Sequence, residues 1–181
     1  MNSVDSGPAV MQIRPLMRVA SGRIPMMRAI IIYESVYGNT RKLAEAIAEG
    51  ISNSGDIEVQ VLKTSEVHHT DDLSGFDGIL FGCPNHNQEP ARNMLKFLDR
   101  ATIVHVKCKI GAAFDTYTGG NKGVAVEKLE ATLREKMPGI ELISRGFSAR
   151  VDDRKGPLAD GELAAGKEFG KRFGTELLEE T

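Results

Sequence analysis

The feature that most constrains this chain is the stretch AIIIYESVYGNT, residues 29–40, where an apolar run gives way at once to a polar loop. Residues 29–33 are apolar without alternation, which is typical of a strand buried on both faces of a parallel sheet. Apolar side chains then recur at helical spacing from Leu43 to Ile51. The loop therefore joins a strand end to a helix start, where free N–H groups and a partial positive charge favour an anion.

The rest of the chain repeats this alternation of strand and helix. Further strands are predicted at residues 57–61, 77–84, 108–114 and 141–147, and further helices at 89–100, 126–137 and 163–177. Such alternation requires a parallel sheet with helices on both faces, joined by right-handed crossovers. We therefore expect a doubly wound α/β fold with five parallel strands in the order 2-1-3-4-5, which binds ligands at the carboxyl ends of strands one and three.

Three loops rich in hydrogen-bonding side chains are expected to meet at that edge of the sheet. They are residues 35–40, 84–88 and 115–120. The carboxyl ends of parallel strands lie at one edge, so the three loops converge although they are far apart in the sequence. This convergence is a stronger indication of a ligand site than any one loop alone.

Composition limits the classes of function. The chain has 181 residues and a net charge of −2; residues 1–28 hold four arginines and one aspartate, net +3, which leaves −5 for residues 29–181. A mildly acidic domain gives no support for nucleic-acid binding. No apolar stretch approaches the ~20 residues that a membrane span needs. With only two cysteines a disulfide framework is not expected, and a reducing compartment, the cytoplasm, is the default.

Residues 1–28 are predicted to lie outside the folded domain, which is expected to span residues 29–181. Three prolines interrupt any long helix in this segment, and it lacks the continuous apolar core of a secretory signal. A disordered extension, a basic arm, and a start codon placed upstream of Met26 or Met27 are the alternatives.

The loop sequence Ser35-Val-Tyr-Gly-Asn-Thr40 resembles the phosphate loop of the flavodoxin family, and the resemblance covers nearly all of residues 29–181. It implies a flavodoxin-like fold that binds FMN. The implied phosphate contacts are Ser35, Val36, Tyr37, Gly38, Asn39 and Thr40, with no lysine or metal needed. The second loop would contact the ribityl chain and the isoalloxazine through Pro84, Asn85, His86 and Asn87. The third would cover the other side of the ring with Asp115, Thr116, Tyr117, Gly119 and Gly120, and Tyr117 is the candidate for stacking.

The resemblance implies an electron-transfer protein that serves redox partner proteins or a small electron acceptor. Two departures keep an enzyme in view: the chain has no Trp to stack on the flavin, and its domain is less acidic than electron-shuttle flavodoxins tend to be. The alternatives are an FMN-dependent NAD(P)H:quinone-type oxidoreductase and a flavin-free binding module. No Gly-x-x-x-x-Gly-Lys-Ser/Thr motif and no Gly-x-Gly-x-x-Gly motif after a strand is present, which argues against nucleotide triphosphatases and dinucleotide folds.

Other chemistry-bearing residues are assigned no catalytic or metal role. Cys83 and His86 have the spacing of half a zinc site, but the other half is missing, so we expect Cys83 to be a buried thiol. Cys108 should lie at the opposite edge of the sheet, too far for a disulfide. Asp115 is either a ring contact or proton relay, or a turn residue. Four basic residues near the last loop either receive acids of a substrate or partner or form a solvated face; they are Arg145, Arg150, Arg154 and Lys155.

Overall fold

The computed structural model describes residues 26–101, 108, 110–143 and 145–180. The predictions for residues 1–25 lie outside the described residues. The strands are β1 (Met27–Tyr33), β2 (Ile57–Lys63), β3 (Gly78–His86), β4 (Glu89–Pro90), β5 (Ile110–Tyr117), β6 (Glu141–Leu142) and β7 (Phe147–Arg150). The α-helices are α1 (Asn39–Ser52), α2 (Arg92–Ala101), α3 (Val124–Lys136) and α4 (Glu162–Glu179). Two 3-10 helices, η1 (Thr64–Glu66) and η2 (Thr70–Gly75), lie between β2 and β3.

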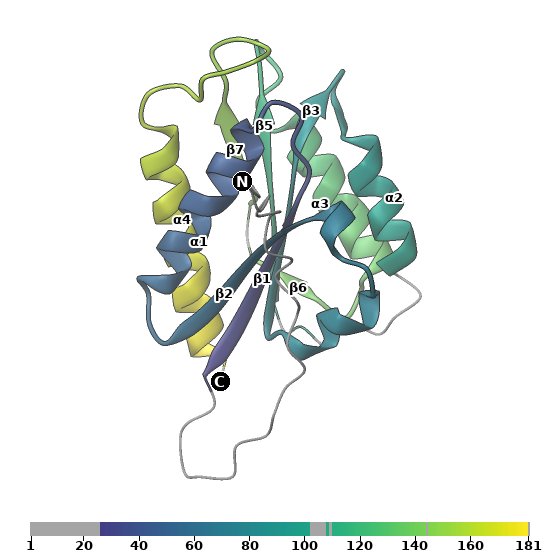
Figure 1. The fold of residues 1–181 in the computed structure, drawn as a ribbon, viewed down its shortest axis with the longest axis vertical. Helices are drawn as coiled ribbons and strands as arrows, with labels where there is room; N and C mark the ends of the chain where they lie inside the picture. The colour runs from purple at the N-terminus through teal and green to yellow at the C-terminus, as the bar shows by residue number, and fades with distance from the viewer. Residues whose placement is uncertain (1–25, 102–107, 109, 144, 181) are drawn as a thin grey trace, which may run out of the picture.

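The sheet confirms the predicted doubly wound arrangement. Its path is β2-β1-β3-β5-β6, with parallel pairing throughout, and β7 also pairs with β5 in parallel. The helices α1 and α4 cover one face and α2 and α3 cover the other (Figure 1). The loop after β1, the end of β3 and the connection from β7 to α4 all lie at the upper edge in Figure 1, as the predicted strand order requires.

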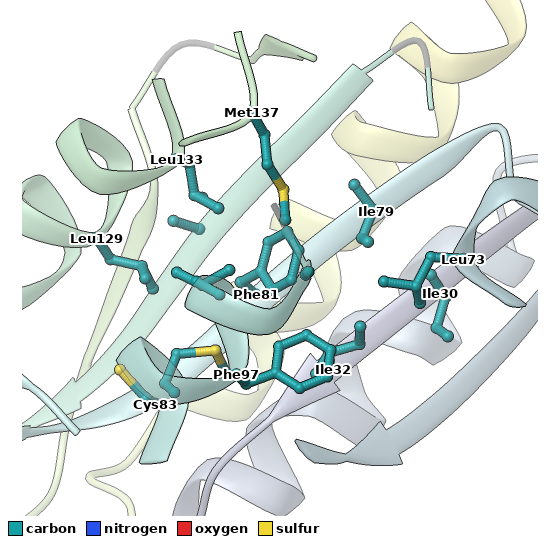
Figure 2. Packing of buried hydrophobic residues seen from close by; sticks show 14 of the residues in the cluster. Ile30, Ile32, Leu73, Ile79, Phe81, Cys83, Phe97, Leu129, Leu133 and Met137 are labelled. Carbon is teal, nitrogen blue, oxygen red and sulfur yellow. The ribbon is translucent and has the colours of Figure 1, made fainter. Parts of the chain in front are cut away.

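Successive residues of β1 point to opposite faces and build two separate cores. Ile30 and Ile32 pack on the α2–α3 side, in the cluster of Figure 2 with Phe81 and Phe97. Ala29 and Ile31 pack on the α1–α4 side. This is why the sequence of β1 is apolar without alternation: both faces of the strand are buried.

The helices α1 and α4 lie unusually close because glycines line their contact. A Cβ atom on Gly50 of α1 would lie 1.9 Å from the carbonyl oxygen of Lys167, and one on Gly170 of α4 would lie 2.0 Å from that of Ile47. Any larger side chain at these positions would push the helices apart. The contact holds α1, whose first residue borders the predicted ligand site, against α4.

The predicted fifth strand at residues 141–147 is wrong in its bounds. The structure divides this segment into β6 and β7, and β7 continues to Arg150. Between them Arg145 has a φ of 50°, and a Cβ on Gly146 would lie 2.4 Å from Val126 Cγ2, so the backbone must turn here and must approach α3 closely. Packing against α3, rather than the apolar pattern, decides where the strand is interrupted.

Three other boundaries differ from the prediction. β5 extends through Asp115, Thr116 and Tyr117, which were expected in a loop, because β7 pairs with all three and β3 pairs with the first two. β3 continues past Pro84 to His86. Residues 89–90 form β4, antiparallel to the end of β3, instead of starting the helix, so α2 begins at Arg92.

Candidate functional site

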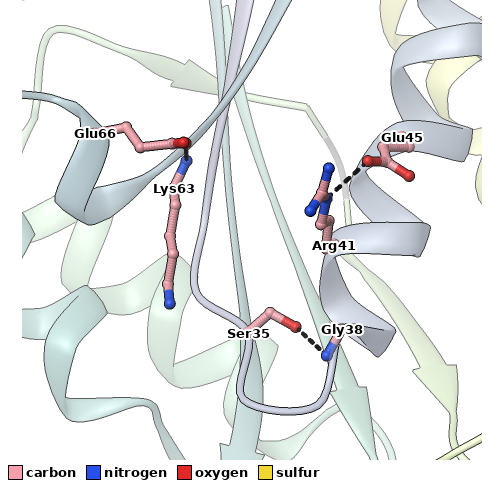
Figure 3. Close-up of polar contacts among 6 residues, drawn as sticks. All are labelled: Ser35, Gly38, Arg41, Glu45, Lys63 and Glu66. Carbon is pink, nitrogen blue, oxygen red and sulfur yellow. Dashed lines mark hydrogen bonds and ion pairs between the residues drawn. The ribbon is translucent and has the colours of Figure 1, made fainter. Parts of the chain in front are cut away.

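The loop from β1 to α1 is preorganised around its own backbone. The N–H of Gly38 donates to Ser35 Oγ at 3.0 Å, which closes the loop into the tight turn seen in Figure 3. Gly38 precedes the first helical residue with a φ of 87°, a left-handed conformation that suits glycine. The start of α1 has no side-chain cap and no acidic residue in its first turn. Its first N–H groups therefore lack intrahelical acceptors and favour an anion.

The second loop is a two-residue hairpin that projects from the end of β3. Asn87 and Gln88 both have positive φ, 53° and 69°, as a type I′ turn requires. The side chain of Asn85 holds the hairpin in place: its Oδ1 accepts the Gln88 N–H at 2.8 Å, and its Nδ2 donates to the Asn121 carbonyl at 3.3 Å. The hairpin is thereby tied to the third loop.

The end of β5 connects the third loop to the first. The hydroxyls of Thr40 and Thr116 share a buried hydrogen bond of 2.8 Å. Beside them the side chain of Asp115 is fully buried and turned toward α3 and β7: Val126 N–H donates to its Oδ2 at 2.9 Å, and the Ser148 hydroxyl donates to its Oδ1. The same hydroxyl accepts the Gly123 N–H at 3.0 Å. Burial raises the pKa of Asp115 to about 6.

A cavity of about 680 Å³ lies between these loops. This volume is in the range of about 300–1,000 Å³ that small-molecule sites occupy. Its lining comes from five segments of the chain: Ser35, Val36, Tyr37, Asn39 and Thr40; Pro84, Asn85, His86 and Asn87; Thr116, Tyr117 and Thr118; Asn121; and Val151 and Arg154. Most of these side chains carry a hydroxyl or an amide group that can donate a hydrogen bond.

The cavity brings together eleven of the fifteen residues that the sequence proposed for the cofactor. The other four are Gly38, Asp115, Gly119 and Gly120. Gly38 shapes the loop, Asp115 is buried behind β5, and Gly119 and Gly120 lie in an exposed turn. Asp115 lies in β5 and not in a turn, and its carboxyl accepts hydrogen bonds from α3 and β7. Contact of the fifteen residues with a cofactor stays a prediction.

Four lining residues were not among the cofactor contacts proposed from the sequence: Thr118, Asn121, Val151 and Arg154. Arg154 was noted there only as one of four basic residues that could receive acids of a substrate or partner. Thr118 and Asn121 belong to or adjoin a loop already predicted to face the ligand. Val151 and Arg154 follow the last strand, whose carboxyl end lies at the same edge of the sheet. Residues that follow a parallel strand lie at the same edge as the ligand site, and this rule could have indicated both positions from the sequence.

The electrostatics of the cavity suit an anion. None of the described residues that line it is acidic, and Arg154 contributes a full positive charge. Two buried acids adjoin lining residues in the chain: Asp115, described above, and Glu34, which follows β1 and accepts a hydrogen bond from the Thr64 hydroxyl. Burial raises the pKa of Glu34. The carboxyl is therefore protonated more easily, which reduces the negative charge beside the loop.

The two cysteines are free, buried thiols, as predicted for Cys83. Burial raises the pKa of each to about 12. Within the described residues, no group of three or more His, Cys, Asp and Glu side chains is arranged to hold a metal ion. None of the helices in that part of the chain is long and apolar enough to cross a membrane.

Comparison with known proteins identifies the family. The family model of the flavodoxin domain matches residues 30–138. The chain belongs to the flavodoxin family. It is 33% identical over 151 residues to the type A flavoprotein fprA of Rhodobacter capsulatus, across 82% of this chain. It is 34% identical over 90 residues, half of this chain, to a flavodoxin of Clostridium saccharobutylicum. The solved structure of a flavodoxin from the domain Archaea matches 84% of this chain and 99% of its own, with a TM-score of 0.72 and 27% identity.

These matches confirm two predictions made from the sequence: the flavodoxin-like α/β fold and the FMN cofactor. The chain matches only part of the length of each of the two curated relatives. This flavodoxin-family chain spans 33% of the length of the type A flavoprotein and 56% of the length of the Clostridium saccharobutylicum flavodoxin. What those whole proteins do is therefore not carried over.

Proposed function

We propose that this chain holds FMN in the cavity at the carboxyl edge of its sheet and carries electrons between redox partners. One observation carries the proposal: a single cavity of about 680 Å³ combines an uncapped helix N-terminus with hydroxyl and amide donors and contains no acidic lining residue. FMN presents a phosphate dianion, a hydroxylated chain and a planar ring. The lining supplies a matching group for each of these parts.

The phosphate is assigned to residues 35–40. The helix start of α1 offers N–H groups and a favourable dipole, and Ser35 and Thr40 add hydroxyls. The hydrogen bond from Gly38 to Ser35 already closes the loop without a ligand, so little conformational entropy is lost when the anion binds. Val36 and Tyr37 are 63% and 45% exposed, which leaves their backbone groups as the expected contacts.

The ring is assigned to the space between the β3–β4 hairpin and the end of β5. Pro84, Asn85, His86 and Asn87 would face one side, and Thr116 and Tyr117 the other. Both tyrosines line the cavity, and Tyr117 is 7% exposed whereas Tyr37 at the rim is 45% exposed. The turn Gly119–Gly120 would cover the ring, and Asp115 would act by holding the start of α3 to β7.

Bound FMN supplies the electron-accepting ring, and the protein contributes its position and surroundings. Asn87 lines the cavity and has a positive φ, and we expect backbone polar groups at this tip of the hairpin to face the ring. Redox partner proteins or a small electron acceptor would approach the exposed rim at Val36 and Tyr37. We keep the cytoplasm as the expected location because both cysteines are free thiols.

The first test is a fluorescence titration of FMN with the flavin-free protein. We expect the flavin fluorescence to reach saturation at one FMN per chain. A redox titration of the complex should then show reduction of the bound flavin. A matched variant, Thr40→Val, removes a lining hydroxyl and should weaken FMN binding. A protein that takes up no FMN under any condition would refute the proposal and would support the flavin-free binding module.

The second candidate is an FMN-dependent NAD(P)H:quinone-type oxidoreductase. The observation in its favour is the position of Arg154 in the cavity, because a cation could also receive an acidic substrate. Steady consumption of NAD(P)H with a quinone would decide for this activity. Failure of NAD(P)H to bleach the bound flavin would decide for the electron carrier.

A further inference from the structure

We propose that Arg154 is a phosphate-binding residue of the cofactor site, which makes this chain select flavin mononucleotide over riboflavin by charge. The inference rests on the proposed function. It adds to the expectation drawn from the loop motif, namely a phosphate held by the loop with no lysine or metal needed. The structure adds a guanidinium to that loop from a distant part of the chain.

The segment after β7 is folded into a tight turn that brings Arg154 to the cavity. Val151 and Leu158 form an antiparallel bridge, and the Asp152 N–H donates to the Pro157 carbonyl at 2.9 Å. At the tip, the Gly156 N–H donates to the Asp153 carbonyl at 2.9 Å. Arg154 therefore sits on a hydrogen-bonded turn and not on an unrestrained chain.

This turn lies against the phosphate end of the cavity. A Cβ atom on Gly156 would lie 2.6 Å from Asn39 Oδ1, so the turn packs directly on the first residue of α1. Gly156 has a φ of 111°, which also favours glycine at this contact. Arg154 is two residues away and lines the same cavity as Asn39. Arg154 and the first residue of α1 thus border the same cavity, which leaves the long Arg154 side chain within reach of an anion bound there.

Among the four basic residues of this region, Arg154 is set apart by its surroundings. Arg150 pairs with Asp152 at 3.2 Å, and Lys155 and Arg145 do not line the cavity. The structure gives the Arg154 guanidinium no hydrogen bond or ion pair with any described residue; only its backbone N–H has a partner, Asp153 Oδ1. A planar guanidinium beside a helix N-terminus is suited to a phosphate monoester, which it can bind through two parallel hydrogen bonds.

The test compares FMN and riboflavin binding to the flavin-free full chain. We expect Arg154→Gln to weaken FMN binding about tenfold, as the loss of one solvent-screened, charge-assisted contact implies. Riboflavin binding should change less than about twofold, since it has no phosphate. Lys155→Gln is the matched control and should leave both affinities unchanged, and Arg154→Lys should restore part of the FMN affinity. Raising the salt concentration should reduce the difference in FMN affinity between wild type and Arg154→Gln.

Each other outcome separates the inference from the proposed function. Equal FMN affinity in wild type and Arg154→Gln would overturn the role of Arg154 and leave FMN binding intact. Equal losses for FMN and riboflavin would show that Arg154 acts on the ring or on the loop, which also overturns the inference. A wild-type chain that binds neither flavin would refute the proposed function, and the inference with it.

Discussion

The buried carboxyl of Asp115 should make this protein less stable as the pH rises, and Asp115→Asn should remove that loss. Burial raises the pKa of Asp115 from 3.8 to about 6, against the opposing hydrogen bonds from Ser148 and Val126. An acid whose pKa is higher in the folded chain stabilises the fold fully below its unfolded pKa. That contribution is lost as the pH rises through the folded pKa of about 6.

The magnitude follows from the size of the shift. A difference of about two pKa units, at about 1.4 kcal/mol each, corresponds to about 3 kcal/mol of unfolding free energy over the whole pH range. About 2 kcal/mol of this should be lost between about pH 4.5 and about pH 7.5. An asparagine keeps the shape and can still accept the Val126 N–H, but it does not ionise.

The assay is urea unfolding of the flavin-free protein at both pH values. FMN is left out because a phosphate monoester itself titrates near pH 6. Glu34, whose pKa burial also raises, contributes equally to wild type and variant and cancels in the difference. The stability advantage of wild type over Asp115→Asn should fall by about 2 kcal/mol with rising pH. The exposed control Asp160→Asn should show no such change.

Two results would refute this reasoning. Parallel pH curves for wild type and Asp115→Asn would show that the carboxyl titrates alike in the folded and unfolded chains. A wild-type advantage that grows with pH would show that the Val126 N–H and the dipole of α3 keep the carboxylate ionised, as a helix N-terminus can. In either case the desolvation of Asp115 would not govern its pKa.

Three further predictions test the packing around the site. Thr40→Val should cost about 1–3 kcal/mol of unfolding free energy because it leaves the buried Thr116 hydroxyl without this partner; Thr40→Ser, which keeps the hydroxyl, should cost less. Gly170→Ala should lower the Tm, with a loss of about 1–3 kcal/mol from overpacking against α1, and an unchanged Tm would contradict the close helix contact. Cys83 and Cys108, with pKa values of about 12, should react with a thiol reagent only after denaturation; labelling of either thiol in the native protein would contradict its burial.

The sequence was sufficient where one local signal and the global fold agreed. The unalternating run of β1 reflects burial on both faces, and the polar loop after it required a helix start. It was insufficient where a residue type suits two structures. Proline at position 90 fits the first turn of a helix as well as the end of an edge strand. The turn at Asn87 and Gln88, both with positive φ, folds residues 89–90 back onto β3, so Pro90 ends a short strand and does not start the helix.

The same limit explains why Arg154 could not be singled out from its neighbours in the sequence. Four basic residues surround the last loop, and their spacing does not distinguish a solvated face from a ligand contact. The distinction depends on the contact between Gly156 and Asn39, which are 117 positions apart in the sequence. The role of Asp115 likewise depends on its hydrogen bond with Ser148, which lies in β7, a strand whose bounds the sequence predicted wrongly. A motif can therefore predict that an anion binds at the start of α1, whereas the charge that meets the anion is set by which loops the fold brings beside it.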